Sequence, residues 1–220
     1  MTVNDRGRGM LNYGYLRELF EACLEAEYQH VENEGSFAAV RDGEVLWLYF
    51  EKSNGAEDWM NNLSYRSVSV GRKDEEWFCH EGFWRAWQSI LPHLEPMVLN
   101  PATRKIITVG YSHGAALALL CHEYIGYLRK DLEEQREGYG FGCPRVIWGT
   151  VPGEGRRWKN FYVVRNIDDA ITHLPPRFLG YRHVGRLIQI GKSGRYSAIE
   201  AHMADNYIRE LIVAESECDK

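Results

Sequence analysis

The chain has 220 residues, of which 45% are hydrophobic and 13% aromatic, and its formal net charge is -5. This composition is typical of a globular protein that buries a sizeable core in one domain. The acidic balance and the lack of any long Lys or Arg run argue against nucleic acid as a partner. The five cysteines are odd in number and contain no C-x-x-C pair, so the sequence predicts buried free thiols rather than disulfides or a metal cluster.

The N-terminal region carries no apolar core of signal-peptide length. The longest apolar run, at residues 115–121, is far shorter than the roughly 18 residues that a membrane-spanning helix requires. We therefore expect a soluble, cytoplasmic protein with no stable membrane insertion. This expectation allows the protein to contact a lipid interface without inserting into it.

The first predicted element is an amphipathic helix near the N-terminus. Leu16, Leu19, Phe20 and Cys23 recur at the three- and four-residue spacing of one helical face. We expect this helix at about 12–30. Because only one side of it is apolar, it should lie against a larger body.

Two strands and a second helix follow. Residues 37–50 predict a β-hairpin that turns at Asp42-Gly43, because Asp-Gly between two β-prone runs is a strong hairpin signal. We expect this hairpin to open the sheet. Residues 81–94 place apolar side chains on one helical face, and Pro92 marks where that helix should stop or bend.

Strands and helices alternate in the rest of the chain. Residues 104–110 predict a strand covered on both faces, and residues 115–128 predict a helix that is apolar nearly all round. Strand-like runs follow at 138–142, 160–165 and 186–191, and the last apolar helical stripe lies at 203–213. This order of elements predicts an α/β sheet with helices on its faces.

Ser112 lies between Gly110 and Gly114, where the predicted strand meets the predicted helix. A G-x-S-x-G sequence in this position is typical of a nucleophile elbow, whose sharp turn leaves no room for side chains at the flanking glycines. The start of the helix would stabilise an oxyanion formed at Ser112, with the N–H of His113 as one donor. The alternative is a tight turn whose serine only caps the helix.

A nucleophilic serine on such an elbow needs an acid and a histidine base, in the chain order Ser, Asp or Glu, His. Two downstream histidines do not fit: His113 adjoins the nucleophile, and His122 lies about 15 Å along the helix. The histidines that stay candidates for the base are His173, His183 and His202.

The candidate acids are Asp168 and Asp169, which directly follow the predicted strand at 160–165. The carboxyl ends of the strands are where an open α/β sheet gathers its catalytic groups. Either carboxylate could orient an imidazole. The spacing alone does not separate them, and two adjacent acids in a loop can also be a solvated pair or a helix cap.

Several blocks of this sequence, in the same order, resemble the class 3 lipase family, the fungal-type triacylglycerol lipases and their relatives. The resemblance extends from about Phe37 to about Tyr207 and implies one α/β-hydrolase domain over 1–220. It also implies a mostly parallel central sheet with helices on both faces and a lid-like segment at about 54–63. The polar composition of the last six residues predicts a frayed tail at about 215–220. The blocks are WLYFEKSNGAEDWMNNL, CHEGFWRAW, VGYSHGAALA, YGFGCPRV, RNIDDAITHLPP and YRHVGRLIQI.

The resemblance also implies roles for individual residues. The family's acid falls on Asp169, and its base, in a segment of the form H-x-x-Y, falls on His202. With Ser112 these residues would form a catalytic triad, while His173 and His183 match positions without a triad role. The oxyanion donors would be the main-chain N–H groups of Ser53 and His113. The lid or substrate pocket would contain Trp59, Met60 and Leu63.

One departure from the family lies beside the expected oxyanion donor, where Glu51-Lys52 replaces Arg-Gly. The predicted function is a serine carboxylic ester hydrolase, a lipase or esterase that takes a small-molecule or lipid ester and needs neither cofactor nor metal. The alternatives are a catalytically silent binding protein with the same fold, and an amidase or acyltransferase with the same triad. The sequence gives no indication of the oligomeric state.

Overall fold

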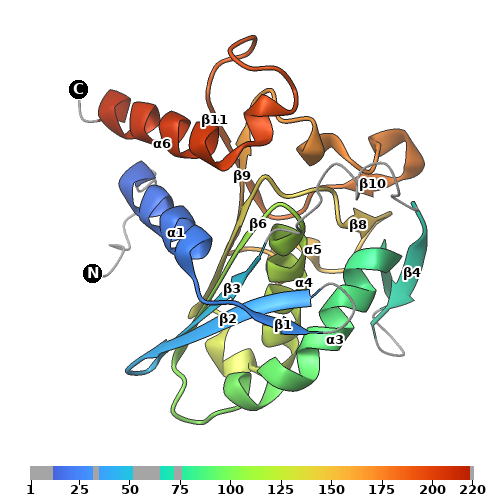
Figure 1. Cartoon of the computed structure of the whole chain (residues 1–220). Helices are drawn as coiled ribbons and strands as arrows, with labels where there is room; N and C mark the ends of the chain where they lie inside the picture. The colour runs from blue at the N-terminus through green and yellow to red at the C-terminus, as the bar shows by residue number, and fades with distance from the viewer. Residues whose placement is uncertain (1–11, 32–34, 52–64, 72–75, 219–220) are drawn as a thin grey trace.

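The computed structural model describes residues 12–31, 35–51, 65–71 and 76–218. Within these ranges a seven-stranded sheet has the order β1-β2-β3-β6-β7-β9-β11 (Figure 1). The strands β3, β6, β7, β9 and β11 run parallel, and β1 and β2 are antiparallel to their neighbours. The strands are β1 (Gln29–Val31), β2 (Gly35–Asp42), β3 (Val45–Phe50), β6 (Lys105–Tyr111), β7 (Arg136–Phe141), β9 (Phe161–Asn166) and β11 (Arg186–Ile190).

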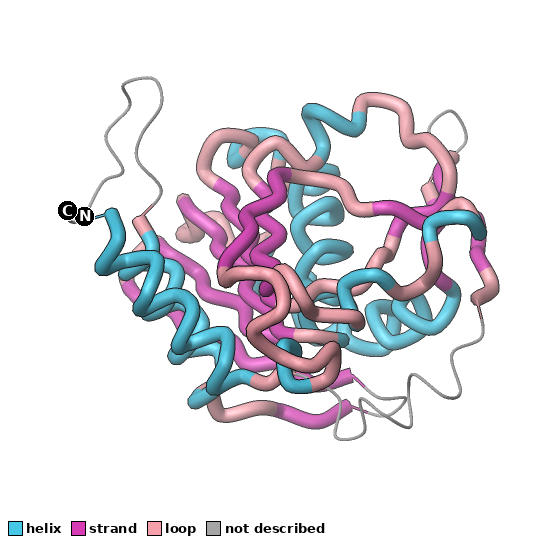
Figure 2. The backbone as a smooth tube through the Cα atoms, turned by 90° about the horizontal axis from the view of Figure 1, so that it is seen from above, coloured by secondary structure: helices cyan, strands magenta, loops and turns pink. Residues whose placement is uncertain are grey.

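Helices cover both faces of the sheet, so the molecule has three layers (Figure 2). Successive residues of a strand point to opposite faces, and β6 shows the result: Ile106 packs with α3 and α4, and Ile107 packs with α1 and α6. The two hydrophobic clusters explain why the central strands are apolar on both sides. The helices of these layers are α1 (Tyr13–Glu25), α3 (Glu81–Val98), α4 (His113–Leu128) and α6 (Ala204–Cys218).

A second sheet, with the strand order β10-β8-β5-β4, lies beside the main one. All of its pairings are antiparallel. The sequence did not predict it, because strands of two to four residues are too short to show a period-two pattern. Its strands and the remaining short helices are β4 (Ser67–Val70), β5 (Trp77–His80), β8 (Ile147–Trp148), β10 (Tyr181–Arg182), α5 (Glu154–Arg157), η1 (Lys130–Leu132), η2 (Ile171–His173), η3 (Arg177–Leu179) and η4 (Glu200–His202).

The hairpin predicted at Asp42-Gly43 forms between β2 and β3. Asp42 pairs with Val45, and Gly43 has a φ of 56°, a backbone conformation that glycine adopts at little cost. The hairpin does not open the sheet, because β1 pairs with the outer side of β2. For the same reason α1 is shorter than predicted and ends at Glu25, where the chain becomes extended at Ala26 and leads into β1.

The helix predicted to stop or bend at Pro92 continues to Val98. A proline inside a helix costs about 3 kcal/mol. Leu94 and Val98 extend the buried face of α3 and are 0% and 1% exposed. Burying two such side chains contributes about 3–6 kcal/mol, which is comparable to the combined cost of Pro92 and Pro96, the two prolines inside α3.

The C-terminal end differs from the frayed tail expected at 215–220, because α6 continues to Cys218. Contacts with other elements explain this extension: Glu215 accepts a hydrogen bond from Arg17 on α1 at 3.2 Å, and Glu217 pairs with Lys192 at 3.5 Å. The free cysteines are buried at Cys23, Cys79, Cys121 and Cys143 and exposed at Cys218. No described helix is both long enough and apolar enough to span a membrane.

Candidate active site

Ser112 occupies the sharp turn between β6 and α4. Its backbone angles are φ 56° and ψ -120°, and it is the only non-glycine residue with positive φ among the described residues. Such a conformation costs on the order of 1–3 kcal/mol and persists only where the surrounding structure enforces it. The side chain of Ser112 makes no capping hydrogen bond to α4. The structure therefore does not have the helix cap that was the alternative interpretation of this motif.

The two glycines that flank Ser112 are required by backbone contacts. A Cβ at Gly110 would lie 2.7 Å from the main-chain N of Ala115 and would clash with the carbonyl group of Gly114. A Cβ at Gly114 would clash with the carbonyl oxygen of Phe50, at the end of β3. Strand β6, helix α4 and the end of β3 thus meet without side chains between them.

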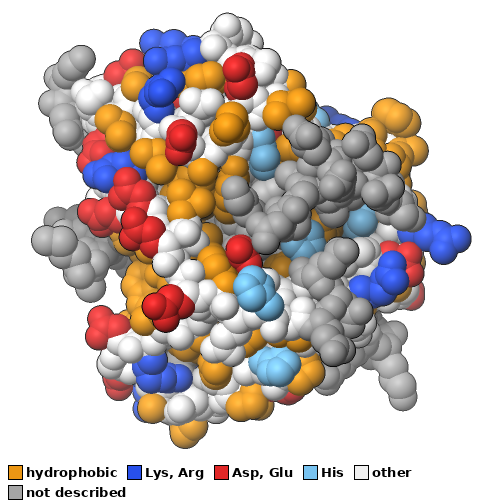
Figure 3. Space-filling view, in the orientation of Figure 1, with side chains coloured by type: hydrophobic (Ala, Val, Ile, Leu, Met, Phe, Trp, Pro, Cys, Tyr) orange, Lys and Arg blue, Asp and Glu red, His pale blue; other side chains and the backbone are white. Residues whose placement is uncertain are grey.

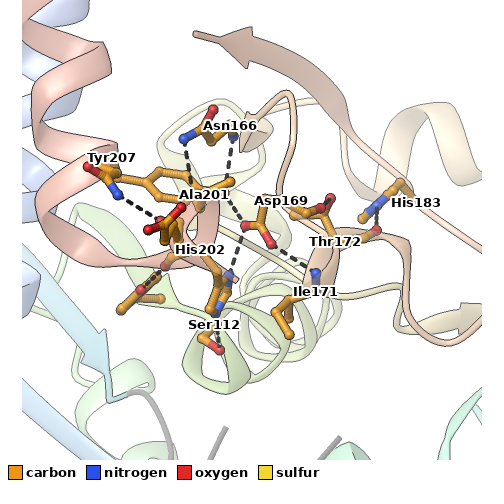
Figure 4. Close-up of polar contacts among 12 residues, drawn as sticks. Ser112, Asn166, Asp169, Ile171, Thr172, His183, Ala201, His202 and Tyr207 are labelled. Carbon is orange, nitrogen blue, oxygen red and sulfur yellow. Dashed lines mark hydrogen bonds and ion pairs between the residues drawn. The ribbon is translucent and has the colours of Figure 1, made fainter. Parts of the chain in front are cut away.

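Ser112, His202 and Asp169 form one hydrogen-bonded chain (Figure 4). The Ser112 hydroxyl donates to His202 Nε2 at 2.8 Å, and His202 Nδ1 donates to Asp169 Oδ2 at 2.8 Å. Asp169 follows β9 and His202 follows β11, so all three residues lie beyond the carboxyl ends of parallel strands. A carboxylate only accepts hydrogen bonds, so this network assigns the proton to Nδ1 and leaves Nε2 free to take the serine proton.

The carboxylate of Asp169 is fully buried and has two further donors. Tyr207 Oη donates to Oδ2 at 2.6 Å, and the main-chain N–H of Ile171 donates to Oδ1 at 2.9 Å. Tyr207 Oη also accepts from the main-chain N–H of Asn166 at 3.1 Å. Burial, and then the charge of Asp169, raise the pKa of Tyr207 well above its usual value, so the phenol stays a donor. The buried carboxylate is therefore fixed by three donors.

Tyr111, directly before the nucleophile, also contacts His202 and helps to position its imidazole ring. Its hydroxyl donates to the main-chain carbonyl of His202, and the two rings are stacked with centroids 5.3 Å apart. Neither Tyr207 nor Tyr111 belonged to the site predicted from the sequence. The H-x-x-Y pattern was a signal for Tyr207, although here the tyrosine follows His202 at five residues.

Asp168 points away from the triad. Its carboxylate accepts from the main-chain N–H groups of Gly194 and Arg195, at 2.8 and 3.2 Å, and from the Ser193 hydroxyl at 3.2 Å. It therefore anchors the loop between β11 and η4. Of the two adjacent acids, the structure brings Asp169 to the imidazole, as the resemblance implied.

The other candidate bases lie away from Ser112. His183 donates from Nε2 to the Thr172 carbonyl at 2.8 Å, and burial lowers its pKa to about 4. His173 is exposed overall, but partial desolvation of its ring, followed by the positive charge of Arg165, lowers its pKa. His122 is buried inside α4, where burial lowers its pKa well below the usual value.

Two other histidines, His80 and His113, have buried side chains and both pack against Phe83. His80 is the N-cap of α3, and its Nδ1 accepts from Gly82 N at 3.2 Å, so this histidine has a structural role. His113, the first residue of α4, packs against Phe83 with ring centroids 5.5 Å apart. Burial, and then the nearby His80, lower the pKa of His113 to about 4.

Part of the predicted site lies outside the described residues. This applies to Lys52 and to the predicted oxyanion and lid residues Ser53, Trp59, Met60 and Leu63. Glu51 is described: its N–H donates to Ser36 O at 3.3 Å. In the described ranges, no group of three or more His, Cys, Asp or Glu side chains is arranged to hold a metal ion.

Comparison with known proteins identifies the family. The family model described as Lipase (class 3) matches residues 47–179. The chain belongs to the class 3 lipase family. This membership and the order of the strands confirm the α/β-hydrolase fold expected from the sequence.

Fungal lipases are among the proteins similar to this member of the class 3 lipase family. Secreted mono- and diacylglycerol lipase 1 of Fusarium solani is 32% identical over 47% of this chain and 32% of its own length. A lipase of Rhizomucor miehei is 27% identical over 64% of this chain and 40% of its own length. The chain therefore spans about a third to two fifths of the length of these relatives.

A solved triacylglycerol lipase, described as having a catalytic centre formed by a serine protease triad, superposes with a TM-score of 0.65. It is 22% identical and covers 76% of this chain and 66% of its own.

Proposed function

We propose that this class 3 lipase is a serine carboxylic ester hydrolase that acts through Ser112, His202 and Asp169. The observation that carries the proposal is the unbroken chain of two 2.8 Å hydrogen bonds that ends at a serine on a strained elbow. A serine that only capped a helix would need neither contact. The fungal relatives, which are lipases, support acyl esters as the substrate class.

The reaction proceeds in two halves. Ser112 Oγ attacks the ester carbonyl carbon while its proton passes to His202 Nε2. The imidazolium, which Asp169 stabilises, then protonates the leaving alcohol as the C–O bond of the ester breaks. Water attacks the resulting acyl-enzyme with His202 as the base, and the carboxylic acid leaves as Ser112 regains its proton.

The tetrahedral intermediates carry a negative oxygen that needs hydrogen-bond donors. We propose the main-chain N–H groups of His113 and Ser53 for this role, since His113 begins α4 directly after the nucleophile. The partial positive charge at the start of this helix favours the same anion. Losing one such donor typically lowers the rate by about 10² to 10³.

Hydrolysis of p-nitrophenyl esters, from acetate to long-chain acyl groups, tests the proposal. We expect turnover and covalent labelling by a fluorophosphonate in the native chain, and loss of both in Ser112→Ala. His202→Ala should also abolish turnover. The matched controls are Ser216→Ala and His93→Ala, at exposed positions.

The same set of ester assays distinguishes the hydrolase from the alternative functions. A catalytically silent binding protein would show neither turnover nor labelling, and this outcome would overturn the enzyme proposal. Added alcohol or amine acceptors would divert the acyl group in an acyltransferase, and amide substrates would be cleaved by an amidase. A rate that rises above the solubility limit of the ester would indicate a lipase rather than an esterase.

We further propose a cytoplasmic location, although the relative in Fusarium solani is described as secreted. Supporting it, the described cysteines are all free, which fits a reducing compartment. Fractionation of cells that make the native protein tests this proposal. Recovery from the medium would refute it.

A further inference from the structure

The connections that follow β7 and β9 together carry an aromatic and basic surface outside the candidate active site. We define the docking surface as Trp148, Phe178 and Leu179 together with Arg145 and Arg177. Phe178 is 86% exposed, and Trp148 and Leu179 are 37% and 38% exposed. Figure 3 shows hydrophobic side chains gathered at the upper right, where η3 and β10 lie in Figure 1.

Local contacts hold the apolar part of the docking surface in this exposed arrangement. Trp148 Nε1 donates to the Leu179 carbonyl at 2.8 Å, and its ring packs edge-on against Phe78 with centroids 5.5 Å apart. Gly180 has a φ of 91°, and a Cβ there would lie 2.7 Å from Trp148 Nε1. The turn after η3 is thus built against the indole, and Phe178 projects into solvent.

The basic part of the docking surface lies beside these aromatic side chains. Arg145 Nη1 donates to Pro175 O at 3.0 Å and also to His173 O. Arg165, at the end of β9, has a buried Nε with no hydrogen-bond partner. Among the described residues, Arg145, Arg165 and Arg177 form no ion pair with a carboxylate. Arg182, by contrast, is paired with Glu154.

Within this cluster of described arginines, like charges act on one another. Burial, followed by the positive charges of Arg165 and Arg177, lowers the pKa of Arg145. Both arginines therefore lie close enough to repel it. The formal net charge of the whole chain is -5, so this concentration of cations stands out against an acidic molecule. An external anion would relieve the repulsion.

We propose that the docking surface binds membranes that contain anionic lipids. Aromatic side chains favour the boundary between headgroups and acyl chains, and arginine binds lipid phosphate groups. Both features occur here on two connections, at 145–148 and 175–179, that hydrogen bonds from Arg145 and Trp148 hold together, with arginines that form no ion pair with a described carboxylate. The inference deepens the proposed function, because it gives an ester hydrolase a class of membrane as its partner.

Binding to vesicles tests this docking independently of catalysis. The full chain with Ser112→Ala, which cannot consume the lipids, is mixed with vesicles of phosphatidylcholine alone or of equimolar phosphatidylcholine and phosphatidylglycerol, and bound protein is measured by flotation. We expect binding to the anionic vesicles only, with affinity that falls as salt concentration rises. Arg177→Gln should weaken this binding about fivefold, and Phe178→Ala about tenfold.

Two control variants replace an arginine by glutamine and an apolar residue by alanine on α6, which lies on the opposite side of the molecule from the docking surface (Figure 1). Arg209 and Ile212 are both exposed, and we expect Arg209→Gln and Ile212→Ala to bind the vesicles as the parent does. No binding, equal binding to both vesicles, or equal losses in the control variants would overturn the proposal.

The docking proposal and the hydrolase proposal can fail separately. With Ser112 intact, Arg177→Gln and Phe178→Ala should hydrolyse a soluble acetate ester at the rate of the native chain. Vesicle binding without ester turnover would refute the hydrolase proposal alone. Turnover without selective vesicle binding would refute the docking proposal alone. Thermal unfolding of each variant checks that the fold is retained.

Discussion

Replacing each of the two adjacent aspartates by asparagine separates a triad residue from a loop anchor. In Asp169→Asn, one carboxylate oxygen becomes an NH₂ group. Oδ1 faces the N–H of Ile171, which is a fixed main-chain donor, whereas Oδ2 faces His202 Nδ1 and the hydroxyl of Tyr207. The main-chain donor cannot adapt, but the imidazole can change its tautomer and the hydroxyl can rotate. The NH₂ group should therefore turn toward His202.

The expected loss of activity in Asp169→Asn follows from this orientation of the amide. With an NH₂ group beside it, Nδ1 of His202 must accept, so Nε2 carries the proton and cannot take one from Ser112. A triad held in the wrong tautomer loses about 10⁴ in kcat. In Asp168→Asn, the amide oxygen still accepts from the main-chain N–H groups of Gly194 and Arg195, so activity should change by only about twofold.

The assay is kcat/KM on a short-chain p-nitrophenyl ester for both variants, beside the native chain. Thermal unfolding shows whether each variant is folded at the assay temperature. Near-native activity in Asp169→Asn, or a greater loss in Asp168→Asn, would refute the assignment of the triad acid. Equal losses in two folded variants would also contradict the reasoning.

Three further changes test other parts of the site. Tyr207→Phe leaves the buried main-chain N–H of Asn166 without its partner and removes one donor from Asp169, so it should lower the free energy of unfolding by about 1–3 kcal/mol, measured by urea denaturation; no loss would mean that this contact is dispensable. Gly114→Ala should abolish ester hydrolysis because its Cβ meets the Phe50 carbonyl, whereas Gly155→Ala, with open space around it, should be active; an active Gly114→Ala would refute the steric argument. The pKa of His113 is about 4 in the folded protein and about 6.5 when unfolded. The unfolded state therefore binds the proton first, and stability falls by about 3 kcal/mol as pH drops from 6.5 to 4. Denaturation at a series of pH values should show a smaller fall in His113→Leu, and an unchanged profile would exclude this histidine as a cause.

The sequence by itself determined the local chemistry of the elbow. A β-branched run, a serine between two glycines and an apolar helix are neighbours in the chain, so their geometry depends on short-range sterics. The alternation of elements and the family resemblance likewise predicted the mostly parallel sheet with helices on both faces. The hairpin at Asp42-Gly43 also followed from its own turn residues.

Local patterns were less reliable where long-range packing competes with them. Pro92 predicted a stop or bend, yet burial of Leu94 and Val98 extends α3 beyond it. The frayed tail predicted from polar composition is helical to Cys218, because charged side chains meet partners on α1 and after β11. Neither partner is close to the tail in the sequence.

Only the tertiary structure decided which side chains face Ser112. His202 is 90 residues from Ser112 and 33 from Asp169, and the parallel order of β6, β7, β9 and β11 closes both distances at one edge of the sheet. The residues alone left two acids and three histidines as candidates, and the resemblance chose among them. Tyr207 contacts the triad acid only because α6 folds back beside the carboxyl end of β9. The sequence determines which reactive side chains the protein contains, and the order of the strands in the sheet determines which of these side chains come into contact.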